Sequence, residues 1–156
     1  MQSANKKFIL TQEGLNNLRE EYNELISVER PAITKRIQNA REFGDLAENS
    51  EYDAAKEEQS LLEARIAQLE EVLPKAKVIS QPQTSDFVVI GSMLVVEMND
   101  EIHEFQIVGS MEANPSEKKI SNESPIGKAL LGLKSGETIE VAFGPVKSKL
   151  KVLEIK

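Results

Sequence analysis

The sequence predicts an α+β protein: an antiparallel hairpin of two long helices, followed by an antiparallel β-rich half that contains one short helix. Three observations support this fold class. Apolar residues recur at helical spacing on both sides of one short break, at residues 43–45. After Lys77 this spacing gives way to short runs rich in β-branched and apolar residues. A Ser-Pro pair inside the second half, at residues 124–125, is typical of a helix start.

The first helix is predicted to begin after Thr11, a good N-cap residue, with Leu10 and Leu15 placed to form a hydrophobic staple across it. The apolar seam of this helix then follows Leu15, Leu18, Tyr22, Leu25, Glu29, Ile33 and Ile37. Its last three steps are each four residues long, a stutter that locally unwinds a coiled coil. Pro31 lies in that stretch, and we expect a kink there rather than the end of the helix.

The second helix is predicted to follow the break and to end at Pro74, which cannot continue a helix. Its seam alternates steps of three and four residues through Tyr52, Ala55, Gln59, Leu62, Ile66, Leu69 and Leu73. Two such seams around one break indicate an antiparallel αα-hairpin. Arms of about 27 residues give a rod roughly 40 Å long. Because the rod is too thin to enclose a pocket, its chemistry must take place at its tip or along its sides.

The second half is predicted to begin after a linker at residues 81–85 and to form an antiparallel sheet. The expected strands are residues 87–90, 93–98, 104–108, 138–143 and 149–155. A short helix is expected over residues 126–131, ended by Gly132, and residues 134–137 are expected to form a turn. The single histidine, His103, is expected in a hairpin turn facing solvent, without a role. The predicted domains are therefore residues 1–80 and 81–156.

Composition limits the function. The chain has 156 residues, no cysteine and a formal charge of −7. Disulfides and thiolate metal sites are therefore excluded, and a reducing cytoplasm is the expected location. Both halves are acidic, which disfavours a protein that binds bare nucleic acid by counterion release. The apolar run at residues 8–10 is too short for a signal peptide or a membrane span, so no membrane association is expected.

The break between the helices carries two carboxylates, Asp45 and Glu48, three residues apart. On a helical turn they would share one face, and their oxygens could bind Mg²⁺ or orient a water beside it. The same spacing also fits an N-cap with its N3 glutamate, and on spacing alone this capping role is favoured. Two exposed carboxylates are too few to hold Mg²⁺, so any metal chemistry would need ligands from another molecule.

Three segments together resemble the bacterial Gre transcript cleavage factors. The first is residues 41–52, REFGDLAENSEY, followed by AAKEEQ at 54–59. The second is ISNESPIGKALLG at residues 120–132, and the third is ILTQEG at residues 9–14. They span nearly the whole chain in order. The small number of basic residues near the break makes the chain more similar to the GreA branch than to the GreB branch.

The resemblance implies a transcription elongation factor whose partner is bacterial RNA polymerase. Gre factors insert their hairpin through the secondary channel of a backtracked polymerase. The family's two tip acids fall on Asp45 and Glu48, which then help the polymerase hold a second Mg²⁺ in its own active centre and cleave the extruded RNA. The factor has no cofactor of its own and is not itself the enzyme. With the resemblance, metal support becomes the favoured role of these acids, and a capping role remains open beside it.

Other residues acquire expected roles from the same resemblance. Arg41 and Lys56 match a basic patch near the RNA 3′ end, where ordinary solvated surface is the alternative; Lys35 and Arg36 are weaker candidates. Asn49 and Glu51 are expected to hold the shape of the loop, and Tyr52 to pack in the seam.

The resemblance also assigns roles in the second half. It matches the FKBP-like domain of the family, and its docking segment falls on Glu123, Ser124, Pro125 and Ile126, with an exposed Ile126 arguing for docking beyond a simple helix cap. Prolyl isomerase activity is not carried over with the fold, since residues 81–156 contain neither Tyr nor Trp. A monomer is expected.

Two alternatives stay open. One is a Gre-like inhibitor that occupies the same channel without promoting cleavage, although those factors have a more aspartate-rich tip. The other is a coiled-coil adaptor or chaperone-like protein, for which the charges of Asp45 and Glu48 would not matter.

Overall fold

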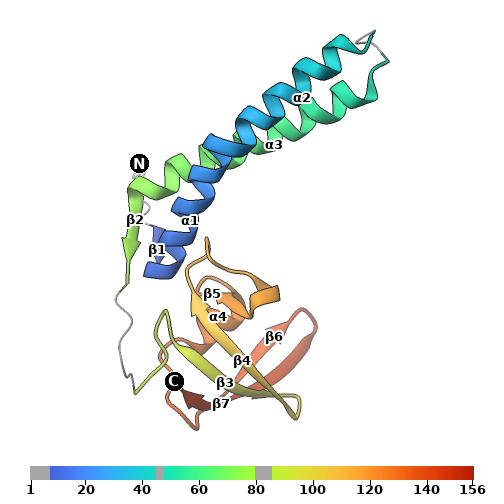
Figure 1. Cartoon of the computed structure of the whole chain (residues 1–156). Helices are drawn as coiled ribbons and strands as arrows, with labels where there is room; N and C mark the ends of the chain where they lie inside the picture. The colour runs from blue at the N-terminus through green and yellow to red at the C-terminus, as the bar shows by residue number, and fades with distance from the viewer. Residues whose placement is uncertain (1–7, 45–47, 80–85) are drawn as a thin grey trace, which may run out of the picture. The chain divides into compact units, whose positions relative to one another are not determined.

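The computed structural model describes residues 8–44, 48–79 and 86–156. They form two compact units, one comprising Leu15–Lys75 and the other the described residues of Met1–Gly14 and Ala76–Lys156. The first unit is helical, and the second contains the sheets and one short helix (Figure 1), which confirms the α+β fold class. The grouping differs from the ranges 1–80 and 81–156, because strands β1 (Phe8–Leu10) and β2 (Ala76–Val78) pair in parallel within the second unit.

The first arm of the hairpin runs without interruption from residue 12 to residue 42. It consists of α1 (Gln12–Glu24), a π-helical segment (Leu25–Glu29) and α2 (Arg30–Glu42). Thr11 caps α1 as predicted: its Oγ1 accepts a hydrogen bond from the Gly14 backbone N–H at 3.0 Å. The Glu112 carboxylate, more than 100 residues away in the sequence, also accepts hydrogen bonds from Thr11 N–H and Oγ1, at 2.7 and 2.5 Å. The start of α1 is therefore anchored by both local and distant groups.

The second arm is α3 (Ser50–Val72), which packs antiparallel to α2 (Figure 1) and continues into a 3₁₀ turn at Leu73–Lys75. The predicted seams are largely confirmed. The buried residues of the arms are Leu15, Leu18, Leu25, Ile33, Ile37, Ala40, Ala55, Leu62, Ile66, Leu69 and Val72. Glu29 is exposed although the seam pattern includes it, and Val72 is buried while Leu73 is only half-buried. The α-helix ends at Val72, two residues before the predicted stop at Pro74, and Pro74 lies within the 3₁₀ turn.

The distortion expected near Pro31 takes the form of the π-helical segment. Arg30 N–H donates to the carbonyl of Leu25, five residues back, instead of four. A π turn accommodates more residues than an α turn, so it suits a seam whose steps have lengthened to four. The helix continues through Pro31, as expected, with the wider turn directly before it.

The second unit contains a curled five-stranded sheet in the order β5-β4-β3-β7-β6 (Figure 1). Its strands are β5 (Lys119–Ser121), β4 (Glu101–Val108), β3 (Met93–Met98), β7 (Val146–Ile155) and β6 (Thr138–Phe143). The sheet is mixed instead of wholly antiparallel, because β5 pairs in parallel with β4. Helix α4 (Pro125–Leu130) contributes Leu130 to the core beneath the sheet, with Val88, Leu94, Val96, Ile107 and Val152.

Some predicted elements were wrong. Residues 87–90 form no strand, since Phe87 makes only a single bridge to Lys134. The Val88 side chain is buried in the core, and its backbone hydrogen-bonds to the loop after α4. His103 lies within β4 and stacks on Phe105 at 5.7 Å instead of occupying a turn. The turn lies at Asn99 and Asp100, both with positive φ. The predicted linker at 81–85 lies outside the described residues.

No helix in the described part of the chain is long and apolar enough to cross a membrane.

Candidate functional site at the end of the helical hairpin

The two arms of the hairpin are joined at their end by the side chain of Asn49. Its Oδ1 accepts a hydrogen bond from Tyr52 N–H at 3.0 Å, which makes Asn49 the N-cap of α3. Its Nδ2 donates to the carbonyl of Ala40, in the last turn of α2, at 2.6 Å. One amide side chain therefore starts one helix and binds the end of the other. The prediction that Asn49 fixes the loop by hydrogen bonds is confirmed.

The capping role considered for Asp45 and Glu48 is wrong for Glu48, because α3 starts at Ser50 with Asn49 as its cap. Glu48 precedes the cap and is exposed. Within residues 8–44, 48–79 and 86–156, its carboxylate has no hydrogen bond or ion pair. Asp45 lies outside the described residues. Among the residues that the structure describes, Glu48 therefore offers an unpaired carboxylate next to the junction of the two arms.

The predicted basic residues lie on both arms close to this junction. The Arg41 guanidinium, from α2, lies 5.9 Å from the centroid of the Tyr52 ring on α3, within the range of a cation–π contact. Lys56 is exposed one helical turn after Tyr52, so it shares a face of α3 with that ring. Its ammonium group donates to Gln59 at 3.1 Å. Arg41 and Lys56 thus both lie near Tyr52, which is half-buried at the junction of the arms.

Arg36, a weaker candidate for the basic patch, has a structural partner instead. Its guanidinium binds the carboxylates of Glu51, at 2.6 Å, and Glu58, both on α3. The hydrogen bond from Arg36 holds the pKa of Glu51 below its ordinary value. Glu51 therefore helps to tie the arms together, whereas its predicted role in the shape of the loop stays a prediction, and Arg36 is already neutralised. Lys35 is exposed.

Phe43 is a surface residue that the sequence analysis treated only as part of the break. Its side chain is 86% exposed, the highest value among the exposed large apolar residues in the described part of the chain. Its backbone N–H donates to the Ala40 carbonyl at 3.3 Å, the same oxygen that Asn49 binds. No signal in the sequence indicates this exposure, because it depends on how the side chain packs.

The predicted docking segment lies where β5 leads into α4. Ser124 Oγ accepts from Gly127 N–H at 3.0 Å and donates to the Ser121 carbonyl at 2.7 Å, so Ser124 is the N-cap that the sequence predicted. A Cβ on Gly127 would lie 2.0 Å from that same carbonyl, so only glycine fits there. Glu123 and Pro125 are exposed.

Ile126 differs from its prediction. It is half-buried and packs against the core of the sheet, because α4 directs this side of its first turn inward. An exposed Ile126 therefore cannot be the argument for docking. The outward-facing part of the segment is formed by Glu123 and Pro125.

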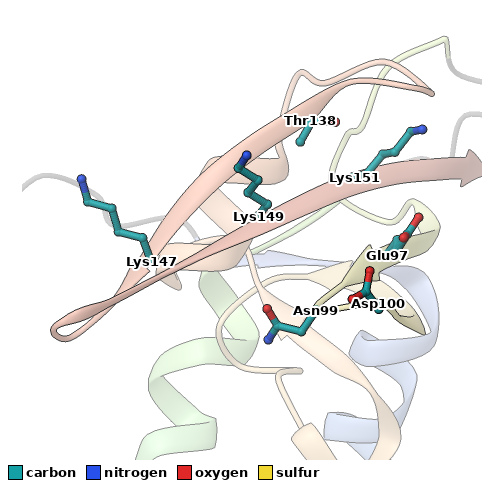
Figure 2. A pocket seen from close by; sticks show the side chains of 7 residues that line it. All are labelled: Glu97, Asn99, Asp100, Thr138, Lys147, Lys149 and Lys151. Carbon is teal, nitrogen blue, oxygen red and sulfur yellow. The ribbon is translucent and has the colours of Figure 1, made fainter.

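A separate polar hollow of about 520 Å³ lies on the sheet, and none of the predicted site residues lines it (Figure 2). Lys147, Lys149 and Lys151 line it from alternate positions of β7, so they share one face of the strand. Opposite them stand Glu97, Asn99 and Asp100 from the end of β3 and the turn after it. Because both charge signs line the hollow, its lysines do not form a surface suited to a uniform polyanion.

These features define a class of protein: a helical hairpin with an exposed carboxylate and cations at its end, joined to a β-sheet module with a capped surface helix. Two family models match almost the whole chain, the N-terminal domain of transcription elongation factors GreA/GreB at residues 8–78 and their C-terminal domain at residues 83–156. The chain therefore belongs to the GreA/GreB family of transcription elongation factors, as the resemblance implied.

Two relatives of similar sequence support the same assignment. The chain is 49% identical to a protein named transcription elongation factor GreA from Acetivibrio thermocellus, over 99% of both chains. It is 53% identical to another of that name from Caldanaerobacter subterraneus subsp. tengcongensis, over 97% of this chain and 98% of the relative. Among solved structures, GreA factor homolog 1 of Thermus thermophilus is 31% identical over 97% of this chain and 99% of its own, with a TM-score of 0.44.

Proposed function

We propose that this elongation factor inserts the end of its hairpin through the secondary channel of bacterial RNA polymerase and stimulates the polymerase to cleave backtracked RNA. It acts in the cytoplasm, as a monomer, and it does not cleave RNA by itself. Family membership supports the polymerase as partner. The observation that carries the proposal is the exposed Glu48, which α3 does not need as a cap because Asn49 fills that position.

The chemistry of Glu48 and Asp45 suits Mg²⁺, which prefers hard oxygen ligands and is usually bound through one or two carboxylates with waters and substrate phosphates. No group of three or more His, Cys, Asp or Glu side chains gathers into a metal site in the part of the chain that the structure describes. The polymerase must therefore supply the remaining ligands. Bound there, Mg²⁺ supplies charge stabilisation to the phosphodiester and a more acidic water.

The remaining predicted residues acquire positioning roles in this proposal. Arg41 and Lys56 attract the phosphates of the extruded RNA, since cations near single-stranded RNA bind its backbone without reading its sequence. Glu123, Ser124, Pro125 and Ile126 form the segment that docks on the rim of the channel. In this segment Ser124 and Ile126 act by fixing α4, and Glu123 and Pro125 supply the exposed surface.

The test is cleavage of labelled RNA in a backtracked elongation complex. The wild-type chain is expected to produce short 3′ fragments, and Asp45→Asn with Glu48→Gln is expected to abolish this stimulation while leaving polymerase binding intact. Glu20→Gln with Glu24→Gln is the matched control, because both residues are exposed carboxylates on α1. Arg41→Ala with Lys56→Ala should slow cleavage more at low salt than at high salt, because salt screens the attraction of these cations to phosphate.

The outcomes also separate the alternatives. A chain that slows RNA synthesis and releases no 3′ fragments would be the Gre-like inhibitor. A double carboxylate variant that stimulates cleavage as well as the wild type would refute metal support by the two acids, and a wild-type chain that neither slows RNA synthesis nor releases 3′ fragments would favour the adaptor.

A further inference from the structure

Among the described residues of the helical unit, Phe43 is the most exposed large apolar side chain. Its ring is 86% exposed, compared with 68% for Leu61 and 58% for Val28 on the same unit. In the described residues, Phe43 takes part in no aromatic pair and no cation–π contact; the nearby Arg41 lies over Tyr52 instead. Leaving a phenyl ring in water forgoes the stabilisation that its burial would bring.

The position of the ring is nevertheless fixed. Phe43 N–H and Asn49 Nδ2 both donate to the carbonyl of Ala40, at 3.3 and 2.6 Å. The backbone of Phe43 and the side chain of Asn49 therefore bind the same carbonyl oxygen. Phe43 stands at the beginning of this loop, and Glu48, next to Asn49, stands at its end.

The following residue, Gly44, has a backbone conformation that favours glycine. Its φ is +129°, a conformation that other residues rarely adopt, and a Cβ at this position would meet nothing within 4 Å. Glycine is thus needed for the turn itself and not for lack of space. With 86% of its surface exposed, the Phe43 side chain is accessible to a ligand.

Three kinds of group consequently surround the junction of the arms: a free aromatic face on Phe43, cations on Arg41 and Lys56, and the carboxylate of Glu48. A single-stranded nucleotide offers the complementary set, a base with a π face, a phosphate and a metal-binding oxygen. Aromatic side chains stack on bases of any sequence, and such stacking typically contributes strongly to single-strand binding.

We propose that the Phe43 ring stacks on a nucleobase in the 3′-terminal segment of the extruded RNA and thereby positions the adjacent phosphodiester beside the acidic loop. This inference deepens the proposed function and rests on it. Phe43 is a positioning residue, because it does not touch the bond that breaks. The alternative partner of the ring is an apolar surface of the polymerase. Contact with such a surface would require an apolar side chain at position 43 but not an aromatic one.

The first test is a double-mutant cycle on cleavage in a backtracked complex. RNA with a normal 3′-terminal nucleotide is compared with RNA whose 3′-terminal nucleotide is abasic, for the wild type, Phe43→Leu and Phe43→Trp. Loss of stacking should slow cleavage about tenfold in Phe43→Leu, whereas Phe43→Trp should retain the wild-type rate. The abasic RNA should slow the wild type by a similar factor and have no further effect on Phe43→Leu.

Two results of this cycle would overturn the proposal. Phe43→Leu with wild-type activity would show that any apolar side chain suffices, as expected for contact with a protein wall. A wild type that cleaves abasic RNA at the normal rate would show that the base does not contact the ring. Leucine retains an apolar side chain at an exposed position, so folding of the hairpin is not at risk.

A second measurement does not depend on cleavage. The fluorescent base 2-aminopurine is placed at the RNA 3′ end, and the complex receives the chain carrying Asp45→Asn and Glu48→Gln. Stacking should quench the fluorescence, and adding Phe43→Leu should remove the quenching. If the double variant quenches the fluorescence but the wild-type chain does not stimulate cleavage, only the proposed function is refuted. If the wild-type chain stimulates cleavage but the double variant does not quench, only the stacking is refuted.

Discussion

Charged residues along the shaft of the hairpin differ in their ion-pair partners from those at its end. Along the shaft, three arginines join one arm to the other through carboxylates: Arg30 to Glu63 at 2.8 Å, Arg65 to Glu21 at 2.6 Å, and Arg36 to Glu51 and Glu58. At the end, Glu48 is exposed and has no partner among the described residues, and Phe43 is exposed beside it.

The difference indicates which charges serve the fold. A paired guanidinium and carboxylate across two thin helices satisfy each other and help to keep the arms in register. Among the described residues, the Glu48 carboxylate makes no comparable contact, so a ligand outside the chain is the better explanation for its role. Asn49 belongs to both regions, since it holds the arms together and also fixes the loop that carries the acids.

The largest effect is expected from breaking this link. Asn49→Ala removes both the N-cap of α3 and the hydrogen bond to Ala40, and it should destabilise the chain by about 1 kcal/mol through the cap alone. Stimulated cleavage should fall further than this loss of stability explains, because the acidic loop loses its anchor. Thermal unfolding and the cleavage assay measure the two effects.

Asn49→Ser sharpens the result. Serine supplies a cap oxygen but lacks the amide N–H that binds Ala40, so it should restore most of the stability and not the cleavage rate. Equal recovery of stability and cleavage would show that the link to Ala40 does not position the loop.

The smallest effect is expected on the shaft. Arg36→Gln removes a bridge that is exposed, so the melting temperature at pH 7 should fall only slightly, and less in 1 M salt than in 0.1 M. The pKa of Glu51 is lowered in the folded chain, so its pairing stabilises the fold above the ordinary carboxylate pKa. This stabilisation is lost as the pH falls through the lowered value.

The difference in melting temperature between wild type and Arg36→Gln should therefore be present at neutral pH and vanish in acid. A difference that persisted at pH 2 would mean that Arg36 acts through packing of its side chain and not through its charge.

The sequence predicted most reliably those features that depend on neighbouring residues. The alternating seam located both arms, Ser124 and Pro125 located the start of α4, and the bounds of β3 and β6 were correct. The short strands β1, β2 and β5 were missed, because each has three residues and exists only through pairing with a distant segment. The positive-φ turn at Asn99 and Asp100 had a local signal that was overlooked.

Less of the candidate site than of the fold could be predicted from the sequence. Spacing alone favoured Asp45 and Glu48 as helix caps, and only the family resemblance pointed to metal support. Asn49 is a common N-cap type, but nothing local in the sequence distinguished it from Asp45 as the start of α3. The exposure of Phe43 and the inward direction of Ile126 depend on packing, which the sequence pattern does not encode.

The most direct test of metal support is the Mg²⁺ dependence of stimulated cleavage, compared between the wild type and Glu48→Gln, with Glu20→Gln as control. If Glu48 helps to hold the ion, the variant should need a higher Mg²⁺ concentration for its half-maximal rate and should recover part of the rate at saturating Mg²⁺. An unchanged Mg²⁺ requirement, with only a lower maximal rate, would contradict the account.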